Sequence, residues 1–336
     1  MKKTLIASAI AAATFSGSVL AQGSNLPTIY GNIQYAIAYD DVKDGRNETN
    51  HYDNGSTIGI KHAHAITPGL EGFFKAEFHF NADDNDDDGI NGNDHGIYEI
   101  DEAYIGIRGE NFGELWIGKD DDTYERSVSI IAEYFEAANL NHGLAYSTGE
   151  GDLVQYMSPS FGGLSVWGAV QYNGDSDTKG GDDKSFPWQL AVVYAMDNLE
   201  LAAAIDSNDN TGLDANNEHS YGFRGTYSLD NLALTAEYHT RKDVEDTYGI
   251  MGVYTLGKNR FALAYERTEQ DFSGESDYDT ITVQALHNLS DNMYVYIEGY
   301  FGGGDDVYDT GYTDATGNTL YSDERTVAVV GATYYF

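Results

Sequence analysis

Apolar and polar residues alternate with a period of two along most of the chain. In residues 29–39, for example, Ile33 and Ile37 alternate with Asn32 and Gln34. Successive side chains of a β-strand point to opposite faces, so such a segment has one apolar and one polar face. The pattern therefore predicts many strands, each with one face suited to an apolar environment and the other suited to water.

The number of strands and the lengths of their connections indicate how they are arranged. The predicted strands cover residues 28–40, 56–66, 71–81, 98–108, 113–119, 151–158, 164–173, 187–196, 199–207, 220–229, 232–241, 247–256, 260–269, 278–289, 293–302 and 324–336. Short turns such as Asp197-Asn198 alternate with long acidic loops such as 303–323. An even number of strands with short turns at one rim and long loops at the other is typical of a bacterial outer-membrane barrel. We therefore predict an all-β fold, a 16-stranded antiparallel transmembrane β-barrel with short periplasmic turns and long external loops. A soluble sandwich shows similar alternation but has no reason for this asymmetry.

The start of the chain differs from the rest. Lys2 and Lys3 precede a run of apolar and small residues that ends at Ala21. This run is too short for a typical membrane-spanning helix. It ends in small residues of the kind that precede a signal-peptidase cleavage site. We predict that residues 1–21 are a cleaved signal peptide, rather than a retained anchor, and that residues 22–336 form the barrel.

Composition and charge exclude several classes of partner. The chain has 18 Lys and Arg against 55 Asp and Glu, a formal net charge of −37. Nucleic-acid binding needs clustered basic residues, so nucleic acid is excluded as a partner. Acidic groups that line a confined space concentrate cations there. The chain has no cysteine, so it has no disulfides.

Several short motifs, in order along these strands, give a family resemblance. They are Ile29-Tyr30-Gly31, Ala103-Tyr104-Ile105-Gly106-Ile107-Arg108, Leu115-Trp116-Ile117-Gly118-Lys119, Gln155-Tyr156-Met157-Ser158-Pro159 and the terminal Phe336. Together they make the whole of residues 22–336 resemble the general (non-specific) trimeric porins of Gram-negative bacteria. Phe336, at the end of an alternating strand, resembles the signal that outer-membrane assembly machinery reads.

The resemblance implies a third external loop that folds into the barrel and narrows it. Here that loop is residues 120–150, whose centre is more apolar than any other loop. The acidic side of the constriction would come from this loop. Its candidates are Glu133, Glu136, Asp120, Asp121 and Asp122.

The opposite wall departs from the family pattern. Thr57, Asp101 and Gln155 stand where related porins commonly have arginine, and only Lys75 and Arg126 could restore positive charge. Carboxylates without basic partners favour cations at close range. We therefore expect a cation-selective channel.

One acidic loop has part of the pattern of a calcium-binding site. Asp84, Asp86 and Asp88 fit the first positions of a calcium-binding loop, but His95 stands where a bidentate Glu is needed. A solvated acidic loop is the simpler interpretation. We expect no cofactor, apart from divalent cations bound loosely near anionic lipopolysaccharide.

These observations favour passive diffusion of small hydrophilic solutes and cations through a homotrimer in the outer membrane of a Gram-negative bacterium, in contact with its lipid and lipopolysaccharide. An enzyme is disfavoured because the sequence has no Gly-x-Ser-x-Gly elbow and no phosphate-binding loop. An adhesin or surface receptor, or a substrate-specific channel, stays as an alternative. Sixteen strands favour conduction because barrels of this size leave an aqueous channel.

Overall fold

The computed structural model describes residues 26–83, 96–138, 140, 142, 146, 148–172, 185–209, 217–271 and 276–336. The predicted signal peptide, residues 1–21, lies outside these residues. So do the weak metal candidates Asp84, Asp86 and Asp88. No helix among the described residues is both long and apolar enough to cross a membrane.

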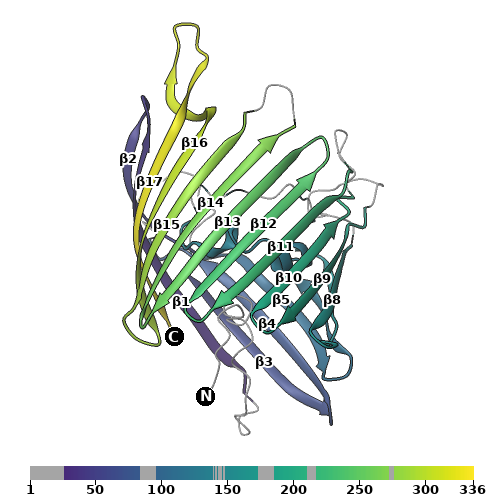
Figure 1. Ribbon diagram of the computed structural model, residues 1–336. Coiled ribbons are helices and arrows are strands. Elements are labelled where there is room, and N and C mark those ends of the chain that lie inside the picture. The colour runs from purple at the N-terminus through teal and green to yellow at the C-terminus, as the bar shows by residue number, and fades with distance from the viewer. Residues whose placement is uncertain are drawn as a thin grey trace.

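The strands of the described residues form one antiparallel sheet that closes on itself (Figure 1). They are β1 (Thr28–Val42), β2 (Asn47–Asp53), β3 (Thr57–Thr67), β4 (Leu70–Phe80), β5 (Ile97–Gly109), β6 (Gly113–Lys119), β7 (Leu153–Met157), β8 (Leu164–Gln171), β9 (Trp188–Met196), β10 (Leu199–Asp206), β11 (Ser220–Leu229), β12 (Leu232–Arg241), β13 (Glu245–Leu256), β14 (Asn259–Gln270), β15 (Tyr278–Asn288), β16 (Met293–Thr313) and β17 (Thr319–Tyr335). From β3 onward each strand pairs with the next, and β1 closes the barrel by pairing with β17. β2 and β3 pair with the second and first halves of β1, so they share one position in the wall. The barrel therefore has the sixteen wall positions predicted.

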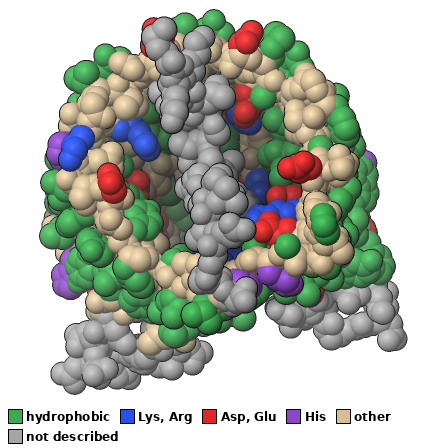
Figure 2. Space-filling view, turned by 90° about the horizontal axis from the view of Figure 1, so that it is seen from below, with side chains coloured by type: hydrophobic (Ala, Val, Ile, Leu, Met, Phe, Trp, Pro, Cys, Tyr) green, Lys and Arg blue, Asp and Glu red, His purple; other side chains and the backbone are tan. Residues whose placement is uncertain are grey.

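The alternation along β1 separates an outer from an inner face, as predicted. Ile33 and Ile37 are 46% and 49% exposed, whereas Ala36 between them is 1% exposed. Viewed from below, hydrophobic side chains cover the outside of the barrel, and acidic and basic side chains lie within its opening (Figure 2). Closure pairs the backbone groups of every strand, which is what a sheet needs in order to cross a bilayer.

The inner face is less hydrophilic than the alternation predicts. One side of the interior carries an apolar cluster that includes Ile131 and Phe135 of the third loop. Its wall members are Ala36, Ala38, Met251, Val253, Ala262, Ala264, Leu286, Tyr296, Tyr300, Val327 and Val329. On this side the inner face is therefore apolar rather than suited to water. The physical reason is that a loop inside the barrel needs an apolar base against which to pack.

Two of the predicted tight turns have the geometry that their sequence requires. Asp197-Asn198 joins β9 to β10, and Asp230-Asn231 joins β11 to β12. The first residue of each turn has a positive φ, 52° for Asp197 and 44° for Asp230. Two-residue hairpins of this type favour Asn and Asp because these residues tolerate the left-handed conformation at low cost.

Two loops near the closure of the barrel are hairpins that continue the wall strands, and we call them the rim hairpins. β16 runs to Thr313 and β17 starts at Thr319, so the predicted loop 303–323 is largely strand. The N–H of Arg46, between β1 and β2, donates to the carbonyl of Thr310 (3.0 Å). The hairpin of β16 and β17 rises above the other labelled strands (Figure 1). The many acidic residues in these segments have low strand propensity, so pairing between distant segments decides their structure.

Candidate functional site

The third loop enters the barrel, as the predicted fold requires. Its first element is helix α2 (Thr123–Val128), which packs against the inner face of β8 to β11. Asp122 caps this helix by accepting a hydrogen bond from the N–H of Glu125 (2.9 Å). The short 3-10 helix η1 (Ala132–Tyr134) follows. Side-chain caps of this kind satisfy backbone donors that the helix itself leaves unpaired.

Two wall carboxylates hold the middle of the loop. Glu237 on β12 accepts hydrogen bonds from the N–H groups of Ile130 (2.9 Å) and the following residue. Glu298 on β16 accepts from the N–H groups of Glu136 (2.8 Å) and Ala137 (3.0 Å). Both carboxylates are buried. Hydrogen bonds to a charged acceptor are the stronger kind, worth about 1.5–3 kcal/mol each. These two residues therefore fix how far the loop extends into the passage.

The returning arm of the loop is fixed by a histidine. The ring of His142 forms hydrogen bonds with the hydroxyls of Thr268 (2.7 Å) on β14 and Thr280 (3.1 Å) on β15. Burial lowers the pKa of His142 to about 4. The ring is therefore neutral at neutral pH, and one nitrogen can donate while the other accepts.

Asp120 and Asp122, two predicted constriction residues, stabilise the root of the loop. Asp120 accepts hydrogen bonds from the indole of Trp116 (2.7 Å) and from the guanidinium of Arg126 (3.2 Å). Asp122 is the helix cap and is 1% exposed. Burial raises the pKa of both carboxyls to about 7. Both side chains are buried at the loop root, which corrects their predicted place at the constriction.

The other predicted loop acids lie further into the lumen. Glu133, on η1, is exposed, and Asp121 is partly exposed. Glu136 is tied to the wall because its carboxylate accepts a hydrogen bond from the hydroxyl of Tyr294 (2.6 Å). Burial is the main reason that the pKa of Glu136 rises to about 7. Of the five predicted loop acids, Glu133 is therefore the one most open to a passing ion.

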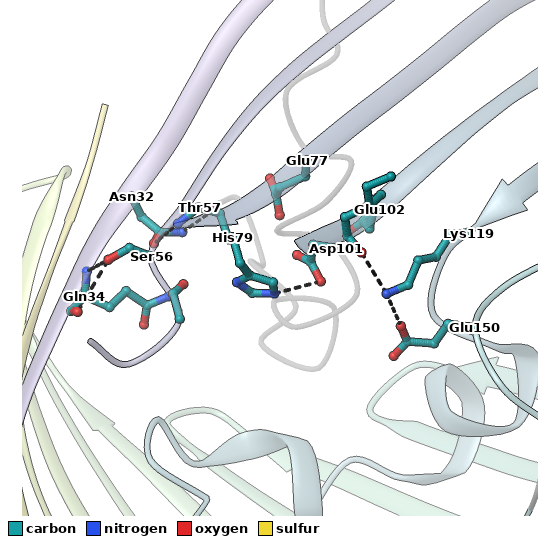
Figure 3. A network of polar contacts seen from close by, with 12 residues as sticks. Asn32, Gln34, Ser56, Thr57, Glu77, His79, Asp101, Glu102, Lys119 and Glu150 are labelled. Carbon is teal, nitrogen blue, oxygen red and sulfur yellow. Dashed lines mark hydrogen bonds and ion pairs between the residues drawn. The ribbon is translucent and has the colours of Figure 1, made fainter. Parts of the chain in front are cut away.

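The wall across from the loop begins with a row of amides and hydroxyls on β1 and β3 (Figure 3). The amide of Asn32 donates to the hydroxyl of Thr57 (3.0 Å) and accepts from the backbone N–H of Thr57 (3.2 Å). The side chain of Gln34 donates to the carbonyl of Gly55 (3.0 Å). Thr57 thus lies on the predicted wall as a neutral hydrogen-bonding group.

Three carboxylates follow on β4 and β5, and we call them the carboxylate cluster: Glu77, Asp101 and Glu102. Each offers an oxygen within 4.8 Å of the oxygens of the other two. The pairing between β4 and β5 shifts between Ala76 and Phe78, so Asp101 and Glu102 together oppose Glu77. Such a β-bulge turns two consecutive side chains toward the same face. Glu102 was missed from the sequence because strict alternation directs neighbouring residues to opposite faces.

Basic groups near the carboxylate cluster are already paired. The ammonium of Lys75 lies 2.5 Å from a carboxylate oxygen of Glu102 and 3.8 Å from one of Glu77. The ring of His79 lies 3.3 Å from Asp101 (Figure 3). Lys75 is therefore on the predicted wall, but its charge is shared among acids that outnumber it.

Gln155 does not lie on the open wall. Its amide donates to the carbonyl of Asp121 (2.8 Å), and its oxygen accepts from the hydroxyl of Thr123 (3.1 Å). It is 1% exposed. The structure thus places Gln155 beneath the start of the third loop, where it supports the loop root.

A closed barrel with an apolar outer face and a loop held across its interior defines a transmembrane channel. Its similarity to known proteins agrees with this class. The model of the Gram-negative porin family matches residues 7–307. The chain therefore belongs to the Gram-negative porin family, whose place is the outer membrane. Family and fold are those of channel proteins.

Individual relatives support this assignment. The monosaccharide porin of Halomonas sp and the major outer membrane protein of Halomonas elongata are each 30% identical to this chain over 363 residues. The matches cover 90% of this chain and 95% of each relative. The anion-selective porin from Comamonas acidovorans has the same fold, with a TM-score of 0.71 over 93% of this chain and 99% of its own, at 18% identity.

Proposed function

We propose that this porin is a cation-selective channel for passive diffusion of small hydrophilic solutes and ions. The observation that carries the proposal is the charge balance of the passage. The carboxylate cluster lies on one wall, and Asp121 and Glu133 lie on the loop opposite it. The ammonium of Lys75 forms an ion pair with the cluster. Carboxylates lining a narrow passage raise the local concentration of cations and repel anions. The shared fold of an anion-selective porin is compatible with this, because side chains at the constriction set ion preference.

Reversal potentials test the selectivity directly. The purified protein is inserted into a planar bilayer between unequal KCl solutions. We expect a potential that favours K⁺, and a shift toward neutrality for Asp101→Asn, which removes one lumenal charge without changing shape. Asp306→Asn, on a rim hairpin, is the matched control and should shift the potential less. A wild-type potential that favours Cl⁻ would overturn the proposal.

A second candidate function is diffusion of neutral sugars along the same passage. The row of amides and hydroxyls at Asn32, Gln34 and Thr57 offers donors and acceptors that suit sugar hydroxyls. A Halomonas relative is named as a monosaccharide porin. Liposome swelling in glucose compared with a disaccharide measures this. Swelling rates that follow solute size alone, unchanged in Asn32→Ala, would rule out a sugar preference.

We also propose that three copies assemble into a homotrimer and that residues 1–21 direct export. The resemblance to trimeric porins supports the first proposal, and the charged start followed by an apolar run supports the second. Mass measurement of the detergent-solubilised protein and sequencing of its amino terminus test both. A monomer, or a mature chain that still begins at Met1, would contradict them.

A further inference from the structure

The carboxylate cluster already contains a cation that the chain itself supplies. The side chain of Lys75 ends between Glu102 (2.5 Å) and Glu77 (3.8 Å), and Asp101 completes the group. A lysine ammonium has three donors and no acceptor, so it satisfies several carboxylate oxygens at once. The bulge in β5 gathers the three acids, and Lys75 is adjacent to Glu77 on the same lumenal wall.

The same oxygens have a spacing that suits a divalent cation. Calcium takes six to eight oxygen ligands at about 2.3–2.6 Å, so two oxygens on opposite sides of one ion are about 4.8 Å apart. The oxygens of Glu77, Asp101 and Glu102 lie within 4.8 Å of one another. Water in the lumen can complete the coordination. Small side-chain movements would therefore let the three carboxylates bind one calcium ion if the ammonium were absent.

We propose that Lys75 is a built-in counter-ion that occupies the carboxylate cluster and prevents divalent cations from binding at the constriction and blocking the channel. Three carboxylates are expected to hold a divalent ion much longer than they hold K⁺, and an ion held in a narrow passage stops conduction. The tethered ammonium competes at a very high local concentration and cannot diffuse away. Lys75 thus keeps an acidic constriction open in divalent-rich surroundings. The inference rests on the channel function proposed above.

Lys61 supplies a matched control. It lies directly opposite Lys75 in the register of β3 and β4. Its ammonium lies 4.6 Å from the centre of the Tyr30 ring, and no ion pair to a carboxylate of the described residues is found for it. Lys61→Met therefore removes the same charge one strand away and leaves the cluster occupied. A general charge effect would appear in both variants, whereas an opened site would appear only when Lys75 is changed.

The test compares wild type, Lys75→Met, Lys75→Gln and Lys61→Met in planar bilayers with KCl and increasing CaCl₂. We expect the Ca²⁺ concentration for half-maximal block to fall at least tenfold in both Lys75 variants, and to stay near the wild-type value in Lys61→Met. Adding Glu102→Gln to Lys75→Met should reverse most of the block. Equal Ca²⁺ sensitivity of the Lys75 and Lys61 variants would overturn the proposal.

A second readout is independent of conduction. Terbium(III), which prefers the same oxygen ligands, is titrated into detergent-solubilised barrels and its luminescence sensitised by nearby aromatic residues is followed. We expect at least tenfold tighter binding to Lys75→Met and Lys75→Gln than to Lys61→Met. Unchanged binding would overturn the proposal even if the channel function stands. Tighter binding in chains that do not conduct would support the site and contradict the channel function.

Discussion

The carboxylate side chains of this protein have different roles because their surroundings differ. Glu298 is 1% exposed and accepts backbone N–H groups of the third loop, so it positions the loop. Glu133 is exposed on that loop, so its charge is open to solvent. Asp122 caps a helix. Burial and hydrogen-bond partners, rather than residue type, assign each role.

The first prediction follows from Glu298. Glu298→Gln keeps the shape of the side chain but removes the charge from an acceptor of two N–H groups, which weakens the anchor by about 1–3 kcal/mol. The loop should then fluctuate more, and single-channel recordings should show open-channel noise several times that of wild type. Glu133→Gln is the control, since it should lower cation selectivity and leave the noise unchanged. Identical noise in Glu298→Gln and wild type would show that this carboxylate does not hold the loop.

At the scale of elements, the third loop combines a fixed path with groups that titrate near neutral pH. Burial raises the pKa of Asp120 and Glu136 to about 7 and that of Glu125 to about 9. An acid is neutral below its pKa and negative above it, so the loop gains negative charge as the pH rises from 6 to 9. The charge of the loop therefore depends on pH.

The second prediction is the direction of that dependence. Cation selectivity, measured as the reversal potential in a KCl gradient, should be higher at pH 9 than at pH 6. In Glu136→Gln one of the titrating charges is absent, so the change should be smaller. A selectivity that stays constant, or that falls as the pH rises, would show that the charge on these loop carboxyls does not act on ions in the passage.

The third prediction concerns the bulge in β5. Deleting Asp101 should restore regular pairing with β4, so that Glu102 alone opposes Glu77 while Ile100, 47% exposed, stays opposite Phe78 on the outer face. We expect a folded barrel with weaker cation selectivity, because the lumen loses one carboxylate while the other side chains keep their faces. The substitution Asp101→Asn keeps the bulge and removes the same charge, so its selectivity should match that of the deletion. A deletion variant that fails to fold would mean that the register of β5 depends on the bulge.

At the scale of the whole molecule, the two ends of the chain meet where the barrel closes. The last residue takes part in this closure: Phe336 exchanges backbone hydrogen bonds with Gly31 on β1 (3.0 and 3.2 Å), and its ring is 52% exposed. Because β1 and β17 come from opposite ends of the chain, the barrel cannot close until both strands are in place.

The fourth prediction tests the end of the chain as an assembly signal. Removing Phe336 should reduce the amount of barrel in the outer membrane several-fold, while the purified chain still refolds in detergent because most β1–β17 pairs are intact. Phe336→Tyr keeps the aromatic ring and should assemble normally. Wild-type amounts in the membrane after the deletion would exclude a role for this residue in assembly.

The barrel, its sixteen wall positions and its tight turns could be predicted from the sequence, because alternation and turn chemistry are local properties of each strand. The inward loop was implied by the resemblance to porins. The sequence could not predict that Glu102 joins Asp101 inside, that Gln155 lies beneath the loop or that the rim hairpins extend as strands. These features depend on pairing and packing between residues far apart in the chain. A one-residue bulge reverses the face of every residue beyond it, and no local pattern reports that shift.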